Sequence, residues 1–367
     1  MTGSLILSIK GDREERLQFE NSMTVSISRF FRDKKLWELM QGRILPLLNQ
    51  KTSQSIKVWS AGCASGEEVY SFKILWEGFR TSVNNISEIY ILATDMNPEC
   101  LDRARIAVYP HSSMREVSMK VVFHEDFCRV YTSDPAAAPG RMESIVEAIE
   151  PYVAFVPAEP ALRQNITAVH SDMHIQNVEN NGLYEIATLA AGGAIQSAQI
   201  GLSEPCFGLI CPPGHHASAN SSWGFCYFNN IAVAMVALHR QKKIKSACVL
   251  DIDLHFGDGT VNIFNQHDWV SVVNIESHNR ISYRQEVETA MKSCRADLIG
   301  ISAGFDNHAD DWGGLLTTED YKEIGRLVRW AANRNKGGCF GILEGGYNHT
   351  VLGENVLALI QGMEDES

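Results

Sequence analysis

Short apolar runs alternate with longer amphipathic stretches through residues 119–364, and this alternation predicts strands that alternate with helices. The runs are apolar and partly β-branched, as strands inside a protein are. We expect strands near 119–123, 207–211, 246–252, 270–275, 297–303 and 338–343. We expect helices near 142–149, 182–200, 229–240, 283–294, 318–333 and 350–362. Gly192 and Gly193 disfavour a continuous helix over 182–200. The pattern predicts an α/β fold with a mostly parallel sheet covered by helices on both faces.

The first 118 residues contain a smaller unit of the same kind. Residues 56–60 predict a strand, a glycine-containing loop follows, and a helix runs from Val69 to about Phe79. A second strand, residues 88–94, ends at Asp95. In such a unit the glycines let a ligand approach the backbone, and the acidic residue can bind ribose hydroxyls. The pattern predicts a partial Rossmann-like unit.

Polar side chains gather where the predicted strands of the larger part end. In open α/β sheets, ligands bind at the carboxyl ends of the strands, so we expect these side chains to share one site. The residues that follow four such strands are the pair His215 and His216, the alternating Asp251, Asp253 and His255, the single Asp306, and Tyr347 after a glycine turn.

These residue types together suit the hydrolysis of an amide. Two carboxylates and an imidazole favour a divalent metal, zinc above all, and three ligands leave one coordination position open. Such a metal polarises a carbonyl and lowers the pKa of bound water to about 7. One histidine can accept the proton of the water while its neighbour donates one to the leaving amine. A carboxylate fixes the imidazole tautomer, and a tyrosine hydroxyl can stabilise the oxyanion.

Each of these motifs also has an ordinary structural explanation. A histidine pair is most often a surface or core feature, and Asp-x-Asp-x-His can be a turn with capping residues. Asp306 alone is typical of a helix cap, and Tyr347 of a packed loop aromatic. Their occurrence together, at successive strand ends, favours a catalytic site. We interpret the other histidines, including His170, His174, His278 and His308, as structural or exposed.

Residues 119 to about 364 resemble the zinc-dependent histone deacetylase and acetylpolyamine amidohydrolase family. The resemblance implies an arginase/deacetylase-like fold and one zinc ion per chain, held by Asp253, His255 and Asp306. It implies that His215, His216 and Tyr347 are catalytic, with Asp251 and Asp258 as the buried carboxylates that orient His215 and His216. We interpret His216 as the base and His215 as the acid or electrostatic partner. A structural potassium site near Asp251 is also implied.

The same fold is known from arginase-like enzymes, so a binuclear manganese ureohydrolase is an alternative. That chemistry needs further aspartate and histidine ligands beside the first metal. Here Asp306 is followed by Asn307 and His308, without a second aspartate two residues on. The tandem histidines and Tyr347 also fit a mononuclear deacetylase better.

The amino-terminal part resembles CheR-type chemotaxis receptor methyltransferases, in the segments around residues 28–33, 59–68, 93–95 and 109–115. The resemblance implies that Arg32, Gly62, Glu67 and Asp95 contact S-adenosylmethionine. It stops near Ser118, before the later strands of a methyltransferase sheet. We therefore interpret the chain as a fusion of a truncated methyltransferase fragment, residues 1–118, with a deacetylase domain, residues 119–367. A methyltransferase-related function is the second alternative.

Charge and composition narrow the class of partner. Residues 1–118 carry 15 Lys and Arg against 14 Asp and Glu, whereas the remaining residues carry 17 against 30. An acidic domain argues against nucleic acid and suits an acetylated amine or an acetyl-lysine peptide. The sequence has no signal-peptide pattern and no long apolar run, and its nine cysteines form no Cys-x-x-Cys pair. We expect a cytoplasmic enzyme that does not bind membranes.

Overall fold

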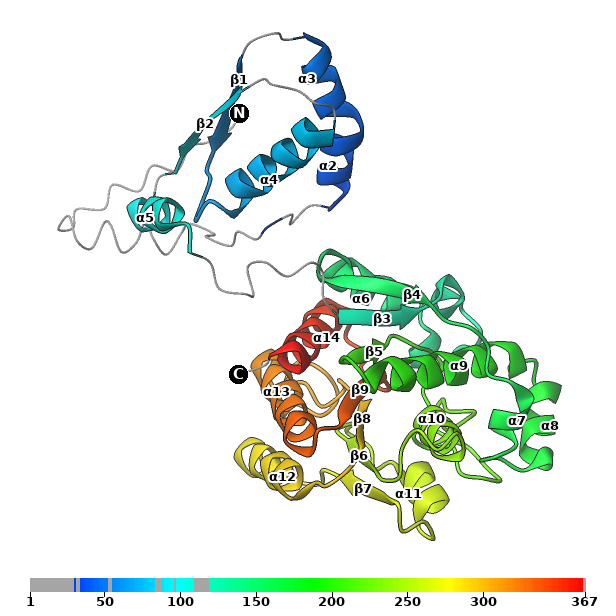
Figure 1. The fold of residues 1–367 in the computed structure, drawn as a ribbon. Coiled ribbons are helices and arrows are strands. Elements are labelled where there is room, and N and C mark those ends of the chain that lie inside the picture. Colours follow the sequence, from blue (N-terminus) through cyan, green and yellow to red (C-terminus); the bar gives the residue numbers. More distant parts are fainter. Residues whose placement is uncertain are drawn as a thin grey trace, which may run out of the picture. The chain divides into compact units, whose positions relative to one another are not determined.

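The computed structural model describes residues 30, 34–51, 55–82, 88–95, 97–108 and 119–365. The chain divides into two compact units, residues 1–116 and residues 117–367 (Figure 1). Each unit has its own hydrophobic core. None of the helices in the described ranges combines the length and the apolar character that a bilayer span requires.

The larger unit is built on a seven-stranded sheet whose neighbouring strands are all parallel. Its strand order is β4-β3-β5-β9-β8-β6-β7. The strands are β3 (Met119–Phe123), β4 (Val153–Pro157), β5 (Cys206–Gly208), β6 (Ala247–Asp251), β7 (Val270–Asn274), β8 (Leu298–Ala303) and β9 (Gly338–Leu343). Every residue of β5, β6, β8 and β9 is buried, which explains their uninterrupted apolar runs.

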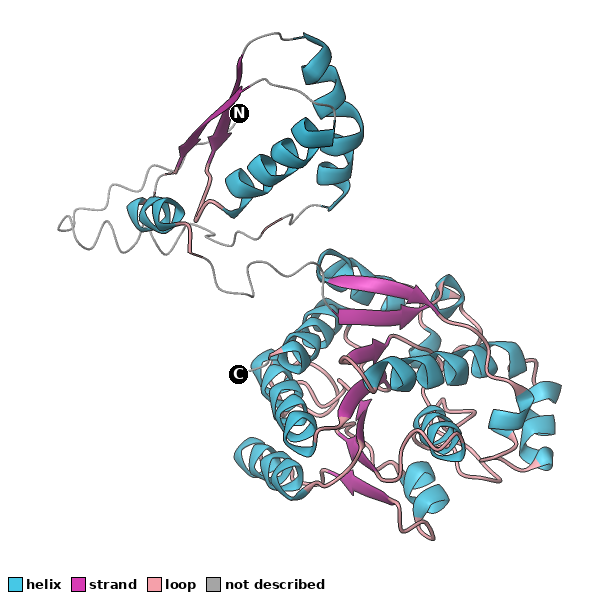
Figure 2. Cartoon of the chain, viewed as in Figure 1, coloured by secondary structure: helices cyan, strands magenta, loops and turns pink. Residues whose placement is uncertain are grey.

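Helices cover both faces of this sheet (Figures 1 and 2). On one side lie α9 and α10, and on the other lie α6, α12, α13 and α14. The helices are α6 (Arg141–Ile149), α7 (Arg163–Ile166), α8 (Asp172–Asn180), α9 (Tyr184–Gly201), α10 (Asn230–Arg240), α11 (Asp258–Phe264), α12 (Arg280–Ser293), α13 (Thr318–Asn335) and α14 (His349–Glu364). Short 3-10 turns cover Glu125–Cys128, Pro135–Ala137 and Glu150–Tyr152. The predicted α/β class is confirmed.

The predicted elements differ from the structure at a few places. Strand β4 and helices α7, α8 and α11 were not expected. Helix α9 is continuous through its glycine pair because a neighbouring segment packs there: a Cβ on Gly192 would lie 1.8 Å from the carbonyl oxygen of Glu159. The 3-10 turn Pro135–Ala137 was not expected either. Ala136 and Ala137 are buried, and the carbonyl of Ala136 accepts hydrogen bonds from Arg141 and Cys211 in the interior.

The smaller unit consists of α2 (Lys34–Leu39), a π-helical turn (Met40–Ile44), α3 (Leu45–Lys51), β1 (Ser55–Ala61), α4 (Glu67–Ser82), β2 (Glu88–Thr94) and α5 (Pro98–Ile106). Strands β1 and β2 are parallel neighbours, as the predicted strand–loop–helix–strand unit requires. Five buried side chains form its core: Trp37, Leu45, Ile56, Phe72 and Trp76. The exposed side chains of Trp59, Tyr90 and Leu92 come from the same two strands.

Candidate metal centre

The three predicted zinc ligands meet at the carboxyl end of the sheet. Asp253 and His255 follow β6, and Asp306 follows the adjacent strand β8. One ligand atom from each lies within 4.8 Å of the other two. Both carboxylates are buried, whereas the side chain of His255 is 41% exposed. The group is therefore open on one side and closed by protein on the other.

The two carboxylates are held in place by backbone N–H groups. Leu254 donates to Asp306 Oδ1 at 3.1 Å, and Gly345 donates to Asp253 Oδ2 at 2.9 Å. Glycine is needed at two places here because the neighbours come so close. A Cβ on Gly304 would lie 2.1 Å from Asp253 Oδ2, and one on Gly345 would lie 2.5 Å from the same oxygen.

The charges of this group favour a bound cation. Burial raises the pKa of Asp306 to about 7, and the negative charge of Asp253 acts in the same direction. The carboxylates of Asp253 and Asp306, each close to His255 Nδ1, raise the pKa of His255 to about 10. The buried Oδ2 of Asp306 makes no well-directed hydrogen bond, although His255 Nδ1 lies 3.1 Å away. Two buried carboxylates and one imidazole with a spare carboxylate oxygen form a donor set that fits zinc.

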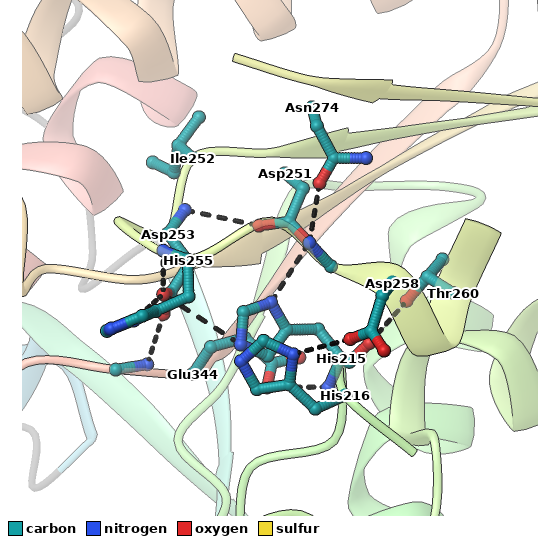
Figure 3. A network of polar contacts seen from close by, with 12 residues as sticks. His215, His216, Asp251, Ile252, Asp253, His255, Asp258, Thr260, Asn274 and Glu344 are labelled. Carbon is teal, nitrogen blue, oxygen red and sulfur yellow. Dashed lines mark hydrogen bonds and ion pairs between the residues drawn. The ribbon is translucent and has the colours of Figure 1, made fainter. Parts of the chain in front are cut away.

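His215 is the inner member of the tandem pair. Its Nδ1 lies 3.1 Å from Asp251 Oδ2, and its Nε2 lies 3.8 Å from Asp253 Oδ1 (Figure 3). Burial alone would lower the pKa of His215, but the charges of Asp253 and Asp251 outweigh it and hold the pKa well above its usual value. Asp251 is buried, as the sequence implied.

His216 is the outer member and has a different environment. Its Nδ1 lies 2.7 Å from Asp258 Oδ1, at the start of α11 (Figure 3). Burial and the charge of His215 lower the pKa of His216 to about 4. The expectation that Asp258 is a buried carboxylate was wrong, since its side chain is 37% exposed. Asp258 is the first residue of α11, a helix that the sequence analysis did not predict, and for this reason its exposure was not expected.

Tyr347 follows β9 and lies beside the metal-ligand group. Asp311 accepts hydrogen bonds from the backbone N–H groups of Tyr347 and Asn348, at 2.8 and 2.7 Å. The ring of Trp312 stacks on the tyrosine ring with centroids 4.1 Å apart, and the guanidinium of Arg141 lies 5.5 Å from the ring centroid. Burial and the charge of Asp253 raise the pKa of Tyr347, so its hydroxyl keeps its proton at neutral pH.

Several residues of the site had no role in the sequence-based prediction. Glu344 is buried, and its Oε2 accepts hydrogen bonds from the backbone of Gly214 and His215, at 2.6 and 3.2 Å. Ligand atoms of His215, Cys226 and Glu344 also lie within 4.8 Å of one another, as a second group that could hold a metal. Glu344 stood in the glycine motif before Tyr347, but a buried acid next to glycines has no distinctive sequence signal.

The four predicted S-adenosylmethionine contacts belong to the smaller unit. Arg32 lies outside the described residues. The Asp95 carboxylate accepts hydrogen bonds from the backbone of Ala64 at 2.7 Å and of Asn97 at 2.8 Å, so it links the loop after β1 to the loop after β2. Gly62 has a positive φ of 71°, and Glu67 is buried. The geometry brings Gly62 and Asp95 to the same end of β1 and β2.

Two family models match the sequence. The model described as "Histone deacetylase domain" matches residues 176–283 and 276–363. The model "CheR methyltransferase, SAM binding domain" matches residues 26–157. The second match extends past Ser118, where we expected the methyltransferase resemblance to stop. Its last part covers β3 and β4, which belong to the seven-stranded sheet of the larger unit.

Individual proteins show the same similarity. The chain is 28% identical to a "Probable deacetylase" of Methanothermobacter thermautotrophicus, over 62% of this chain and 85% of that protein. It is 28% identical to a "Histone deacetylase-like amidohydrolase" of Pseudomonas aeruginosa, over 49% of this chain and 58% of that protein. The crystal structure of the HDA15 HD domain superimposes with a TM-score of 0.58 at 23% identity, over 68% of this chain and 91% of that one. This structural match supports the fold.

Proposed function

The chain belongs to the histone deacetylase domain family, and on that premise we propose that residues 119–367 form a zinc-dependent deacetylase that hydrolyses an acetyl-amide. The observation that carries the proposal is the open group of Asp253, His255 and Asp306 beside two histidines and a tyrosine. The relatives named above support an amidohydrolase. We propose acetyl-lysine in a peptide, or an acetylated polyamine, as the substrate.

In this proposal a zinc ion held by Asp253, His255 and Asp306 would polarise the acetyl carbonyl and lower the pKa of a water molecule. His216 would accept a proton from the attacking water at Nε2, because its Nδ1 is committed to Asp258. His215, held through Nδ1 by Asp251, provides positive charge or a proton for the leaving amine. Tyr347 donates its hydroxyl hydrogen to the oxyanion, which requires the neutral phenol that burial maintains.

The binuclear manganese alternative has less support. His308, the histidine nearest in sequence to Asp306, accepts a hydrogen bond at Nδ1 from the backbone of Asp310 within its own loop. Among the described residues, the groups of side chains that could hold a metal do not include it. The potassium site and the S-adenosylmethionine contacts stay predictions, and so does the division of the chain into residues 1–118 and 119–367.

The test uses the full chain with an acetyl-lysine peptide and N-acetylputrescine as substrates. We expect a chelator to abolish hydrolysis and about one equivalent of zinc to restore it. Tyr347→Phe should keep the zinc stoichiometry while kcat falls by roughly 10²–10³, since only the oxyanion donor is removed. Full metal loading without hydrolysis of either substrate would contradict the deacetylase function. Full activity of Tyr347→Phe would contradict only the role proposed for the tyrosine.

A further inference from the structure

The outer histidine–carboxylate pair is exposed in a way that the inner pair is not. The side chain of Asp251, which holds His215, is 1% exposed, whereas that of Asp258, which holds His216, is 37% exposed. Water competes for an exposed carboxylate, and a single hydrogen bond then orients an imidazole weakly. Some other feature must therefore hold the outer pair.

Trp223 contacts both members of this outer pair. Its indole Nε1 donates to Asp258, at 3.2 Å from Oδ1 and 3.0 Å from Oδ2. Its ring stacks on the imidazole of His216, with centroids 3.8 Å apart and planes tilted by 30°. One side chain thus restrains the carboxylate through its N–H group and the imidazole through its ring.

The local backbone places Trp223 against the pair. The next two residues, Gly224 and Phe225, have positive φ angles of 59° and 67°, and the N–H of Cys226 closes the turn on the carbonyl of Trp223 at 3.1 Å. A Cβ on Gly224 would lie 2.5 Å from His216 Cδ2. The turn is therefore built tightly against the imidazole, although Trp223 as a whole residue is 55% exposed.

The charge of Asp258 agrees with this arrangement. Burial would raise the pKa of Asp258, but hydrogen bonds from His216 and Trp223 outweigh it and keep the pKa below its usual value. The carboxylate is thus ionised and accepts from both donors at once. An indole N–H can only donate, so it cannot compete with Asp258 for the proton on His216 Nδ1.

We propose that Trp223 is a positioning residue for His216, which it orients through Asp258 and through ring stacking. The inference rests on the proposed function, because it concerns the histidine to which that function assigns the base. It extends the histidine–carboxylate pair to a set of three side chains. Trp223 itself touches no reacting atom in this account.

Trp223→Phe separates this role from simple packing, because phenylalanine keeps a stacking ring and removes the N–H donor. Loss of a group that orients a catalytic ligand or base is worth roughly 10–100-fold. We expect kcat to fall about ten-fold with KM changed less than two-fold. The matched control is Trp330→Phe on α13, where a similarly exposed indole lies against Arg334 and should leave both constants unchanged.

A double-mutant cycle with Asp258→Ala tests whether Trp223 acts through the carboxylate. If it does, Trp223→Phe costs little further kcat once Asp258 is alanine. Wild-type kcat in Trp223→Phe would overturn the proposal. If Trp223→Phe lowered kcat by the same factor with and without the Asp258 carboxylate, the proposal would be overturned as well, since the indole N–H would then act elsewhere.

A readout without catalysis keeps this result distinct from the proposed function. The chain has seven tryptophans, and ¹⁵N-labelled indole signals can be assigned by the loss of one signal in Trp223→Phe. We expect that signal to shift upfield in Asp258→Ala, because the hydrogen bond to a carboxylate is lost. An unshifted signal would overturn the contact. A shifted signal in a protein that hydrolyses no acetyl-amide would support the contact and contradict the deacetylase alone.

Discussion

At the scale of single residues, the two adjacent histidines of the site have pKa values shifted in opposite directions because their partners differ. His215 lies between two aspartates and its pKa is raised, while the adjacent His216 has a lowered pKa. The sequence identifies the two histidines as a pair, but it does not reveal that their pKa values shift in opposite directions. What distinguishes them is the set of groups around each ring: Trp223 stacks on His216, and the charge of Glu344 adds to the raised pKa of His215.

His170 shows the same dependence on partners away from the proposed chemistry. Its Nδ1 lies 3.0 Å from the carbonyl oxygen of Ser218 and its Nε2 accepts from the N–H of Asn229 at 2.9 Å. These two partners require a neutral ring protonated at Nδ1. Burial first, and then the charge of His174, lower the pKa of His170 to about 3. The expected structural role fits this environment.

A neutral buried histidine makes stability depend on pH. The unfolded chain takes up a proton near pH 6.5 and the folded chain only near pH 3, so stability is full above pH 6.5 and falls as the pH drops. We expect wild type to lose about 2 kcal/mol more than His170→Gln between pH 6.5 and 5. Glutamine keeps a donor and an acceptor without titrating. Urea unfolding at both pH values measures the difference, and equal losses would contradict the assignment.

At the scale of elements, the sequence predicts the strands that are buried along their whole length. It does not predict the elements that depend on their position at a sheet edge or on contacts with other segments. Strands β6, β8 and β9 are buried along their whole length, and their apolar runs predicted them within one or two residues. Strand β4 lies at a sheet edge and mixes buried with exposed positions, so its signal is weak. Helix α9 continues through its glycine pair because contact with another segment outweighs the low helix propensity of glycine.

The same distinction applies to the site. Residues that follow strands on the sequence, such as Asp253, Asp306 and Tyr347, could be placed together because parallel strands share a carboxyl edge. Residues that reach the site from loops could not be placed, since no periodicity relates them to the sheet. Trp223, Asp311 and Trp312 belong to this second class. Helix α11 begins within the motif itself, and for that reason the exposure of Asp258 was misjudged.

At the scale of the whole molecule, two units of unequal size share one chain. The larger unit has an extensive buried core around a seven-stranded sheet, whereas the described core of the smaller unit has five buried side chains. A two-stranded sheet buries little apolar area and is marginal in stability. The family similarity of the smaller unit is to a domain that binds S-adenosylmethionine, and that of the larger is to a deacetylase.

We therefore expect two thermal transitions, with the smaller unit unfolding first. Zinc at about a hundred times its dissociation constant should stabilise only the second transition, by about 2.7 kcal/mol, because its proposed ligands all lie in the larger unit. Differential scanning calorimetry of the full chain, with zinc and with chelator, measures both midpoints. A single transition that shifts as a whole with zinc would contradict independent units.

X-ray absorption at the zinc edge of the fully loaded protein tests the central claim most directly, because the two candidate metal groups differ in one atom type. The group of Asp253, His255 and Asp306 offers only nitrogen and oxygen, whereas the group of His215, Cys226 and Glu344 includes sulfur. The proposed site predicts a first shell of nitrogen and oxygen near 2.0–2.2 Å. A sulfur scatterer near 2.3 Å would place the metal at Cys226 and contradict the account.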